Sequence, residues 1–518
     1  MSNPSPWWRG ASVYHIYVRS FFDSNGDGQG DLAGVLAKMD YIASLGVDAI
    51  WLSPVHPSPN RDWGYDVSDY HGIHPDYGAM SDLEAVIAGA HERGMKLLLD
   101  EVLAHTSDEH AWFHESRAGG DKADWYVWAP LKDDGTAPNN WLSAFGGPAW
   151  AYHPQRRAAY HHKFLRQQPK LNWRHPEARA AALEVLDFWL SKGVDGFRLD
   201  VANAYLHDPA LTDNPVDDSD TGPRWSAAAN FQRHFNDSNL PENIAALDDV
   251  RRTVDRHPDR FVFGEFSEEA GRCGGFAAPD EGLHAGYSFP LLLARRMGPE
   301  FIRGHMEMLA QHPDHWPCIT FSNHDVPRTP SRFGDGSAPV AKIMLALLLT
   351  LRGSILIYQG EELGLPEASL TREQLRDPVG DLYWPAHKGR DGCRTPMPWS
   401  ASAANLGFSE GTPWLPAAPE HADLTVESQD RDPLSTLTLS RRLLALRNDH
   451  PVLKLGEIAF RDAPGPLAVF ERRLGDDAIL CVFNLGPDSP PADPAWDEGE
   501  TLLEGAMGQA FAWRIARL

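Results

Sequence analysis

The fold is decided by the stretch Gly196-Phe197-Arg198-Leu199-Asp200-Val201, a short strand-like run that ends in an acidic residue and a valine. The preceding stretch, 176–192, repeats apolar residues at steps of three and four, as an amphipathic helix does. A helix followed by a short buried strand is the repeating unit of a parallel sheet, in which functional residues gather at the carboxyl ends of the strands. We therefore predict a buried strand that presents Asp200 at its carboxyl end.

Seven further runs have the same character and are separated by amphipathic helical stretches. Eight parallel strands are the number that closes a (β/α)8 barrel, so we predict an α/β protein with the TIM-barrel fold. The expected strands are 13–20, 47–53, 96–102, 196–201, 261–265, 285–289, 318–322 and 355–358, and the expected helices include 32–45, 81–93, 176–192 and 435–448.

The chain of 518 residues is longer than a barrel of about 250 residues requires. Two connections are too long for ordinary loops, so we interpret them as inserted subdomains. Near the C-terminus, alternating apolar and polar residues predict strands of a small β-sandwich. The expected domains are a barrel over 1–105 and 175–454 with an insertion at 364–430 after strand 8, an inserted domain B over 106–174 after strand 3, and a C-terminal β domain over 455–518.

Composition narrows the function classes. The chain has 72 acidic and 47 basic residues, and its net charge of -25 opposes binding to nucleic acid or to an anionic membrane. No stretch approaches the ~20 apolar residues that a membrane span needs. The four cysteines have neither metal-binding nor redox spacing, which predicts reduced thiols in a cytoplasmic protein. The 18 tryptophans suit stacking against sugar rings, although most tryptophans serve the core.

Three expected strands lead directly to a carboxylate: Asp200, Glu265 and Asp325. Glycoside hydrolysis needs one carboxyl group as nucleophile or base and a second as proton donor, and its transition state is positively charged. Arg198 lies two residues before Asp200, on the same face of the strand, and would keep that aspartate ionised. Burial beside 261–263 would raise the pKa of Glu265. Any one of these acids could instead serve an ion pair or a helix cap, but three at the ends of separate strands favour catalysis.

With these acids in place, the chain resembles glycoside hydrolase family 13, the α-amylase family, in its α-glucosidase and oligo-1,6-glucosidase branch. The motifs stand as Asp100-Glu101-Val102-Leu103-Ala104-His105, residues 196–200, Gly264-Glu265 and Asn323-His324-Asp325. The resemblance implies that Asp200 is the nucleophile, Glu265 the acid/base and Asp325 the stabiliser of the transition state. It also implies that His105, Arg198 and His324 line the subsite for the glucosyl unit.

The stretch 62–66 is similar to a motif of the exo-acting members of this branch. It implies that Tyr65 stacks under the sugar and that Asp62 binds the far end of the sugar. Arg394, within 392–399, matches the arginine that pairs with that aspartate. Phe145 and Phe164 correspond to aromatic residues at the pocket entrance, although either could belong to the core of the inserted domain.

Two departures from the family pattern stand out. Ala104 replaces a usual asparagine, which weakens any claim for the calcium site of the α-amylases. Lys170, in 168–172, replaces a usual aspartate, so different local contacts are expected there.

A different loop, 23–31, has the ligand spacing of a calcium loop: oxygen-bearing side chains at positions one, three, five and nine, and a carbonyl at seven. The glutamate of an EF-hand is missing at position twelve, and an acidic turn without a metal is the alternative. Related glucosidases are similar here, which implies one structural divalent cation, Ca²⁺ or Mg²⁺, and no organic cofactor. The expected ligands are Asp23, Asn25, Asp27, Gln29 and Asp31.

The resemblance implies a retaining α-glucosidase that releases α-glucose from the non-reducing end of short α-glucosides. Val201, after the nucleophile, resembles members that cleave 1,6 bonds, but the choice between 1,4 and 1,6 bonds stays open. The alternatives are a sucrose isomerase, an amylosucrase or another glucosyltransferase on this scaffold, all of which would form the same glucosyl-enzyme. A non-enzymatic transporter subunit of this fold is a remote alternative, because those proteins carry a membrane span and lack the catalytic acids. The oligomeric state is left open.

Overall fold

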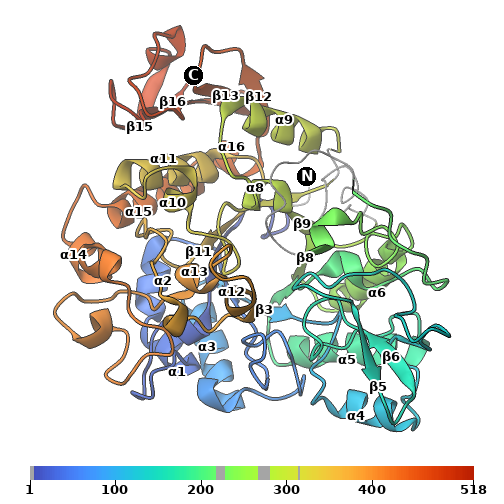
Figure 1. Cartoon of the computed structure of the whole chain (residues 1–518). Coiled ribbons are helices and arrows are strands. Elements are labelled where there is room, and N and C mark those ends of the chain that lie inside the picture. Colours follow the sequence, from blue (N-terminus) through green and yellow to red (C-terminus); the bar gives the residue numbers. More distant parts are fainter. Residues whose placement is uncertain (1–4, 218–227, 267–280, 313–314) are drawn as a thin grey trace.

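A computed structural model describes residues 5–217, 228–266, 281–312 and 315–518. Eight parallel strands close a barrel in the order β1-β11-β10-β9-β8-β7-β3-β2, which confirms the predicted TIM barrel (Figure 1). Each of the eight predicted runs supplies one strand. The barrel strands are β1 (Ser12–Ile16), β2 (Ala49–Leu52), β3 (Lys96–Glu101), β7 (Gly196–Leu199), β8 (Phe261–Phe266), β9 (Ala285–Ser288), β10 (Pro317–Ile319) and β11 (Ser354–Tyr358).

The first strand is shorter than predicted. It ends at Ile16, and Val18–Ser20 form a 3-10 turn instead of its last residues. The reason is a change of hydrogen-bond partner, because the backbone N–H of Tyr17 donates to Oε1 of Gln359 at 2.9 Å rather than to a neighbouring strand. The chain then turns away from the barrel.

Helices surround the barrel on the outside, as a (β/α)8 fold requires. The predicted helix 32–45 is divided at Lys38, whose φ of -103° and ψ of 11° separate two shorter helices. The helices of this layer are α1 (Leu32–Ala37), α2 (Met39–Leu45), α3 (Met80–Glu92), α5 (Pro176–Ser191), α6 (Asn243–Asp255), α8 (Phe289–Leu292), α9 (Pro299–Ala310), α10 (Thr329–Phe333), α11 (Ala338–Thr350), α15 (Thr436–Asp449) and α16 (Pro451–Leu455).

Strand alternation places the charged residues of β7 inside the barrel. Phe197 and Leu199 pack outwards in the helix layer, so Arg198 between them points inwards. The parallel register sets Arg198 opposite Asp100 on β3 and Phe263 on β8. Charged groups therefore meet near the carboxyl ends of the strands, above an apolar barrel interior.

The segment between β3 and α5 folds beside the barrel as a small sheet with strand order β4-β6-β5 (lower right in Figure 1). Tryptophan and alanine side chains form its separate core. Its elements are α4 (Ala111–Ala118), β4 (Trp128–Ala129), β5 (Trp150–His153) and β6 (Ala158–His161).

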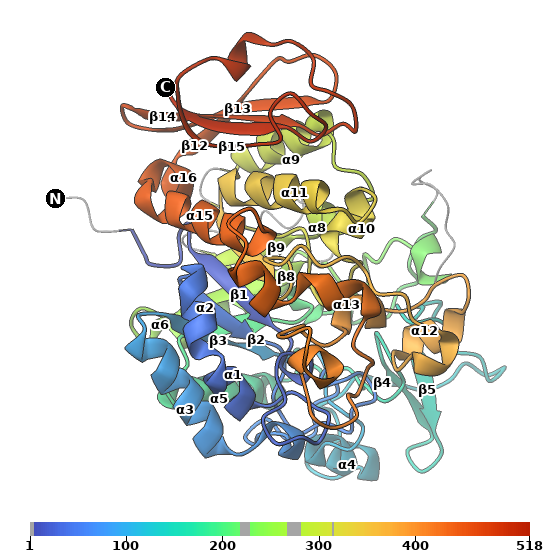
Figure 2. The same cartoon turned by 90° about the vertical axis from the view of Figure 1, so that its left-hand side faces the viewer.

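The C-terminal β domain is an antiparallel sheet of order β12-β13-β14-β16-β15 (top of Figure 2). One face packs on α9, α11 and α16, and the other is covered by Ala495 and Trp496. Between β11 and α15 the chain forms short helices and no sheet. The elements are α12 (Pro378–Tyr383), α13 (Asp391–Arg394), α14 (Val426–Asp430), β12 (Glu457–Arg461), β13 (Leu467–Leu474), β14 (Asp477–Asn484), β15 (Glu500–Gly505) and β16 (Trp513–Arg517).

Composition predicted no membrane span and reduced cysteines. Among the described residues, no helix is both long and apolar enough to span a membrane. Cys318, Cys393 and Cys481 are free and buried. Cys273 lies outside the described residues.

Candidate active site

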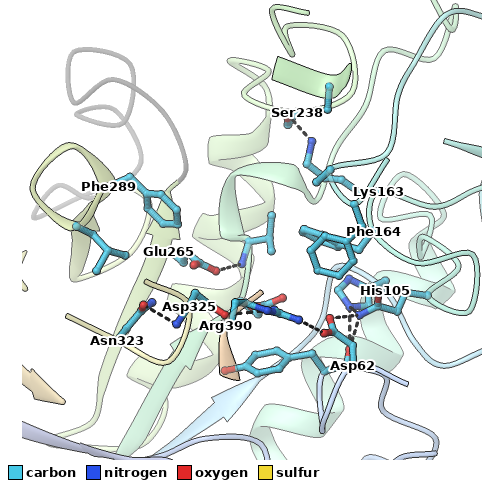
Figure 3. A pocket seen from close by; sticks show the side chains of 18 of the residues that line it. Asp62, His105, Lys163, Phe164, Ser238, Glu265, Phe289, Asn323, Asp325 and Arg390 are labelled. Atoms are coloured by element: carbon cyan, nitrogen blue, oxygen red, sulfur yellow. Dashed lines mark hydrogen bonds and ion pairs between the residues drawn. The ribbon is translucent and has the colours of Figure 1, made fainter. Parts of the chain in front are cut away.

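A cavity of about 380 Å³ opens at the carboxyl ends of the barrel strands, within the range of small-molecule sites. Figure 3 shows Asp62, Glu265, Asp325 and Arg390 around this cavity. Predicted residues that line it are Asp62, Tyr65, His105, Phe145, Phe164, Asp200, Glu265, His324 and Asp325, whereas Arg198 and Arg394 are not among the lining residues.

Arg198 is the centre of the polar network below the cavity. Its guanidinium is fully buried and donates from Nη1 to Asp100 at 2.7 Å and to Asp200 at 2.9 Å. Its Nη2 lies 2.7 Å from Oε2 of Glu265 and 3.2 Å from the hydroxyl of Tyr287. That hydroxyl donates to Oε1 of Glu265 at 3.0 Å. One cation therefore joins three carboxylates from three strands.

The protonation of these carboxylates differs from the expectation that Arg198 keeps Asp200 ionised. Burial raises the pKa of Asp200 well above its usual value, and the neighbouring Glu265 and Asp100 add to the rise, while Arg198 opposes it. Burial likewise raises the pKa of Asp100 to about 6, again against Arg198. Burial and the two neighbouring carboxylates therefore outweigh Arg198 and favour the protonated form of Asp200 in the absence of substrate.

The third predicted acid, Asp325, has a different environment. Its Oδ1 lies 3.2 Å from Nη1 of Arg390 and 2.9 Å from Nη2 of Arg394, and its backbone N–H donates to the side chain of Asn323 at 2.8 Å. Burial alone would raise its pKa, but Arg390, Arg394 and Arg198 together hold the pKa of Asp325 below its usual value. Asp325 is thus ionised at neutral pH and faces the cavity.

The arginine that pairs with Asp62 was predicted wrongly. Nη2 of Arg390, not of Arg394, lies 2.6 Å from Oδ1 of Asp62. Arg394 instead donates to the carbonyl of His324 at 2.7 Å and to Asp325. Arg390 immediately precedes helix α13 and Arg394 is its last residue. The motif 392–399 contains only Arg394, whereas Arg390 lies two residues before it, and the orientation of α13 decides which arginine reaches Asp62.

Other predicted residues shape the cavity walls. The rings of Tyr65 and His324 stack with centroids 5.1 Å apart. His105 donates from Nε2 to the carbonyl of Tyr65 at 2.9 Å, and burial lowers its pKa to about 4, so its ring is neutral at pH 7. Phe145 and Phe164 lie with ring centroids 5.4 Å apart on the side of the inserted segment, and both border the cavity.

Sequence reasoning missed several contributing residues. Gln168 donates to Oδ2 of Asp62 at 3.0 Å and also reaches the carbonyl of Tyr65. Tyr287 binds Glu265 and Arg198 from β9. Tyr287 lies on a predicted strand, where a polar residue close to the carboxyl end was the available signal. Nothing in the local pattern around Gln168 points to Asp62, which is 106 residues away.

The residue after Asp200 has an unusual backbone. Val201 has φ 44° and ψ 45°, the left-handed region, which is strained for a β-branched residue. Such strain costs roughly 1–3 kcal/mol and persists only where surrounding contacts enforce it. The contact here is the backbone N–H of Val201, which donates to Oε2 of Glu265 at 3.0 Å. The strained turn thus links the strand of Asp200 to the carboxylate of Glu265.

The five predicted metal ligands of the loop 23–31 differ in their exposure to solvent. Asp23 and Asp31 are buried, while Asn25 and Asp27 are exposed and Gln29 is half-buried. Burial raises the pKa of Asp31, and Asp23 adds to the rise. The side chains of Asp23, Asn25 and Asp27 accept hydrogen bonds from backbone N–H groups of the same loop. In the described part of the chain, no three His, Cys, Asp or Glu residues are grouped as metal ligands.

We predict that Arg390→Met destabilises the protein more at pH 7 than at about pH 2.5. Burial would raise the pKa of Asp377, but Arg390, helped by Arg394 and a backbone N–H, lowers it to about 2. This contribution to stability is present above the usual aspartate pKa of ~3.9 and is lost as the pH falls towards 2. Without Arg390, buried carboxylates lose their cation at a cost of about 3–5 kcal/mol at pH 7. Urea unfolding at both pH values measures the difference.

The matched control is Arg431→Met, which removes an exposed arginine paired with Glu427 at 2.6 Å. Exposed pairs contribute little, so its unfolding free energy should match that of the wild type at both pH values. Equal destabilisation by the two substitutions would contradict the assignment of Arg390.

Comparison with known proteins identifies the family of the chain. The model of the α-amylase catalytic domain matches residues 15–456. A probable α-glucosidase from Rhizobium meliloti (strain 1021) is 46% identical over 93% of this chain and 90% of its own length. An oligo-1,6-glucosidase from Parageobacillus thermoglucosidasius is 35% identical over 93% and 91%.

Solved structures extend the similarity to the whole fold. An α-glucosyl transfer enzyme, XgtA, superposes with a TM-score of 0.93 at 43% identity, covering 99% of this chain and 100% of its own. A trehalulose synthase, MutB, from Pseudomonas mesoacidophila MX-45 gives a TM-score of 0.88 at 31% identity with the same coverage. The chain therefore belongs to glycoside hydrolase family 13, the α-amylase family, in its α-glucosidase and oligo-1,6-glucosidase branch.

Proposed function

We propose that the protein is a retaining, exo-acting α-glucosidase that releases α-glucose from the non-reducing end of short α-glucosides. The observation that carries this proposal is the pair Asp200 and Glu265, held on one guanidinium at the base of a cavity. Retaining glycosidases need their two carboxyls about 5–5.5 Å apart, whereas inverting enzymes separate them by about 6.5–9.5 Å. Two carboxylates bound to adjacent nitrogens of Arg198 fit the shorter separation.

The proposed mechanism requires one proton on the two acids Asp200 and Glu265. With substrate bound, that proton is on Glu265, which donates it to the glycosidic oxygen as Asp200 attacks the anomeric carbon. The aglycone leaves with the proton, and glucose is esterified to Asp200. Glu265, now ionised, takes a proton from water, whose oxygen attacks the anomeric carbon and restores Asp200. Asp325, ionised and facing the cavity, favours the positively charged transition state.

The far end of the cavity supports the removal of one unit at a time. Asp62 and Arg390 form a buried ion pair there, with Gln168 bound to the second oxygen of Asp62. A carboxylate has about four acceptor sites, so Asp62 can still accept from sugar hydroxyls. The buried ion pair leaves no passage for a longer chain. An endo-acting amylase would need the substrate to continue past this point.

We predict that Asp200→Asn and Glu265→Gln each abolish most turnover of an α-glucoside. Each amide keeps the shape but cannot act as nucleophile or acid/base, and a positioned acid/base alone contributes about 10²–10⁴-fold. Wild-type glucose, followed by NMR directly after release, should appear first as the α anomer. Early β-glucose, or an amide variant with unchanged kcat, would refute the mechanism.

Transfer to a sugar hydroxyl is a second candidate function. The observation in its favour is the match to XgtA, an α-glucosyl transfer enzyme, over nearly the full length of both chains. Hydrolysis and transfer share the glucosyl-enzyme at Asp200 and differ in whether water or a sugar hydroxyl attacks it. The homologues named as glucosidases favour hydrolysis as the main activity.

Val201 offers a test of linkage preference. Its side chain borders the cavity next to Asp200, at a backbone that is already strained. We predict that Val201→Thr shifts relative activity from 1,6 towards 1,4 bonds. The measurement incubates wild type and variant with isomaltose, maltose and sucrose and separates the products, which also gives the share of transfer. An unchanged ratio of isomaltose to maltose activity would remove Val201 as the determinant.

We further propose that the loop 23–31 binds one structural divalent cation and that the protein is cytoplasmic. The oxygen-only ligand set and the buried, mutually repelling Asp23 and Asp31 support the cation. The three buried free thiols support the reducing compartment.

Removal of the cation should lower thermal stability. We predict that Ca²⁺ added to chelator-treated protein raises Tm, because an ion that binds only the folded state stabilises it by mass action. Asp27→Ala should abolish this response, and Asp133→Ala, an exposed acid outside the loop, should keep it. A Tm that is the same with chelator and with Ca²⁺ or Mg²⁺ would leave the loop as an acidic turn.

A further inference from the structure

Lys170 is the lysine that stands where this branch usually has an aspartate, and the structure buries it between two parts of the molecule. Its backbone belongs to the inserted segment, since its N–H donates to His161 at 2.9 Å and its carbonyl accepts from Val127 at 3.2 Å. It also forms a β-bridge with His105 at the cavity wall. The residue is only 2% exposed.

The ammonium of Lys170 reaches out of the inserted segment to the barrel. It donates to the carbonyl of Ala204 and, at 3.3 Å, to that of Tyr205. Within the described residues, no carboxylate lies within ion-pair distance of it; Asp237, an acid that acts on it electrostatically, is paired with Lys163 at 3.2 Å. Backbone carbonyls are therefore the direct partners of a buried positive charge.

Those two carbonyls belong to the turn that follows Asp200. The turn begins at the strained Val201, whose N–H binds Glu265 and whose carbonyl accepts from the N–H of Ala204 at 2.9 Å. Lys170 holds the opposite end of the same turn. A strained backbone persists only where surrounding contacts enforce it. Glu265 binds the start of the turn at Val201, and Lys170 binds its end at Ala204 and Tyr205.

We propose that Lys170 is a positioning residue that, from the inserted segment, holds the turn after Asp200 and thereby sets the geometry of Asp200 and Glu265. This inference rests on the proposed function and deepens it. The inserted segment would then contribute to the chemical step as well as to the cavity wall. A misplacement of about 1 Å at reacting groups costs about 10²-fold in rate, so a lost tether should appear in kcat.

The energetics of Lys170 support a functional rather than a stabilising role. Burial, together with Lys163, lowers the pKa of Lys170 to about 7, against the opposing effect of Asp237. A lysine whose pKa falls on folding lowers the free energy of unfolding. This cost is complete below about pH 7, the pKa in the folded state, and it disappears as the pH rises towards ~10.4, the pKa in the unfolded state. The charged and titratable groups that act on it are His105, His161, Lys163, Arg174, His207 and Asp237.

The test compares Lys170→Met, which keeps the chain length without the charge, with Lys170→Arg, which keeps charge and donors. The matched control is Lys122→Met, which removes a partly exposed lysine of the inserted segment that is paired with Glu115 and does not line the cavity. For each variant we would measure kcat on isomaltose, the Ki of 1-deoxynojirimycin, a glucose-shaped inhibitor, and Tm at pH 6.

We expect Lys170→Met to lose about 10- to 100-fold in kcat while the Ki stays within about threefold and Tm at pH 6 does not fall. The kcat of Lys170→Arg should be higher than that of Lys170→Met, and the kcat of Lys122→Met should match that of the wild type. Unchanged kcat in Lys170→Met, a joint fall of kcat, affinity and Tm, or unfolding of both Lys170 variants would overturn the inference. Wild-type protein without activity on any α-glucoside would instead refute the proposed function, and this inference with it.

Discussion

The guanidinium of Arg198 is the interaction on which the site depends. It is completely buried, and it contacts Asp100, Asp200 and Glu265 at 2.7–2.9 Å. Three carboxylates so close together could not all remain ionised in a buried site, because burial and mutual repulsion both favour protonation. Arg198 compensates this only in part, and the pKa of Asp200 stays raised. The proposed double displacement needs one of the two reacting acids protonated and the other ionised.

A second arginine, Arg390, performs a similar task at the other end of the cavity. It contacts Asp62, Asp325 and Asp377 and so joins the segment after β2, the segment after β10 and the long connection after β11. The barrel alone would present acids at its strand ends with too few cations to balance them. The connections add Arg390, Arg394 and Gln168 together with the aromatic wall of Phe145 and Phe164. The barrel strands thus hold the proposed reacting acids, whereas the inserted segments supply the arginines that balance their charge and the side chains that close the pocket.

Much of this arrangement is predictable from local patterns. Alternation along 196–200 correctly places Arg198 and Asp200 on one face, because successive side chains of a strand point to opposite sides. The eight runs correctly predict the barrel, since strand number and parallel order decide closure. The boundary of β1 was predicted too late, because the N–H of Tyr17 finds the side chain of Gln359, which is 342 residues away. The choice of Arg394 as partner of Asp62 failed for a similar reason, since the two arginines lie one helical turn apart.

Sequence by itself determined the barrel, the residues at the ends of its strands and the family resemblance, because these follow from short-range periodicity and from motifs only a few residues long. Tertiary structure alone decided which arginine meets Asp62, that burial outweighs Arg198 at Asp200, and that Lys170 reaches the carbonyls after Asp200. Each of these depends on the distance between groups from distant segments and on the exclusion of water around them. Coulomb interactions and desolvation both depend on that geometry, which no local pattern of residues encodes.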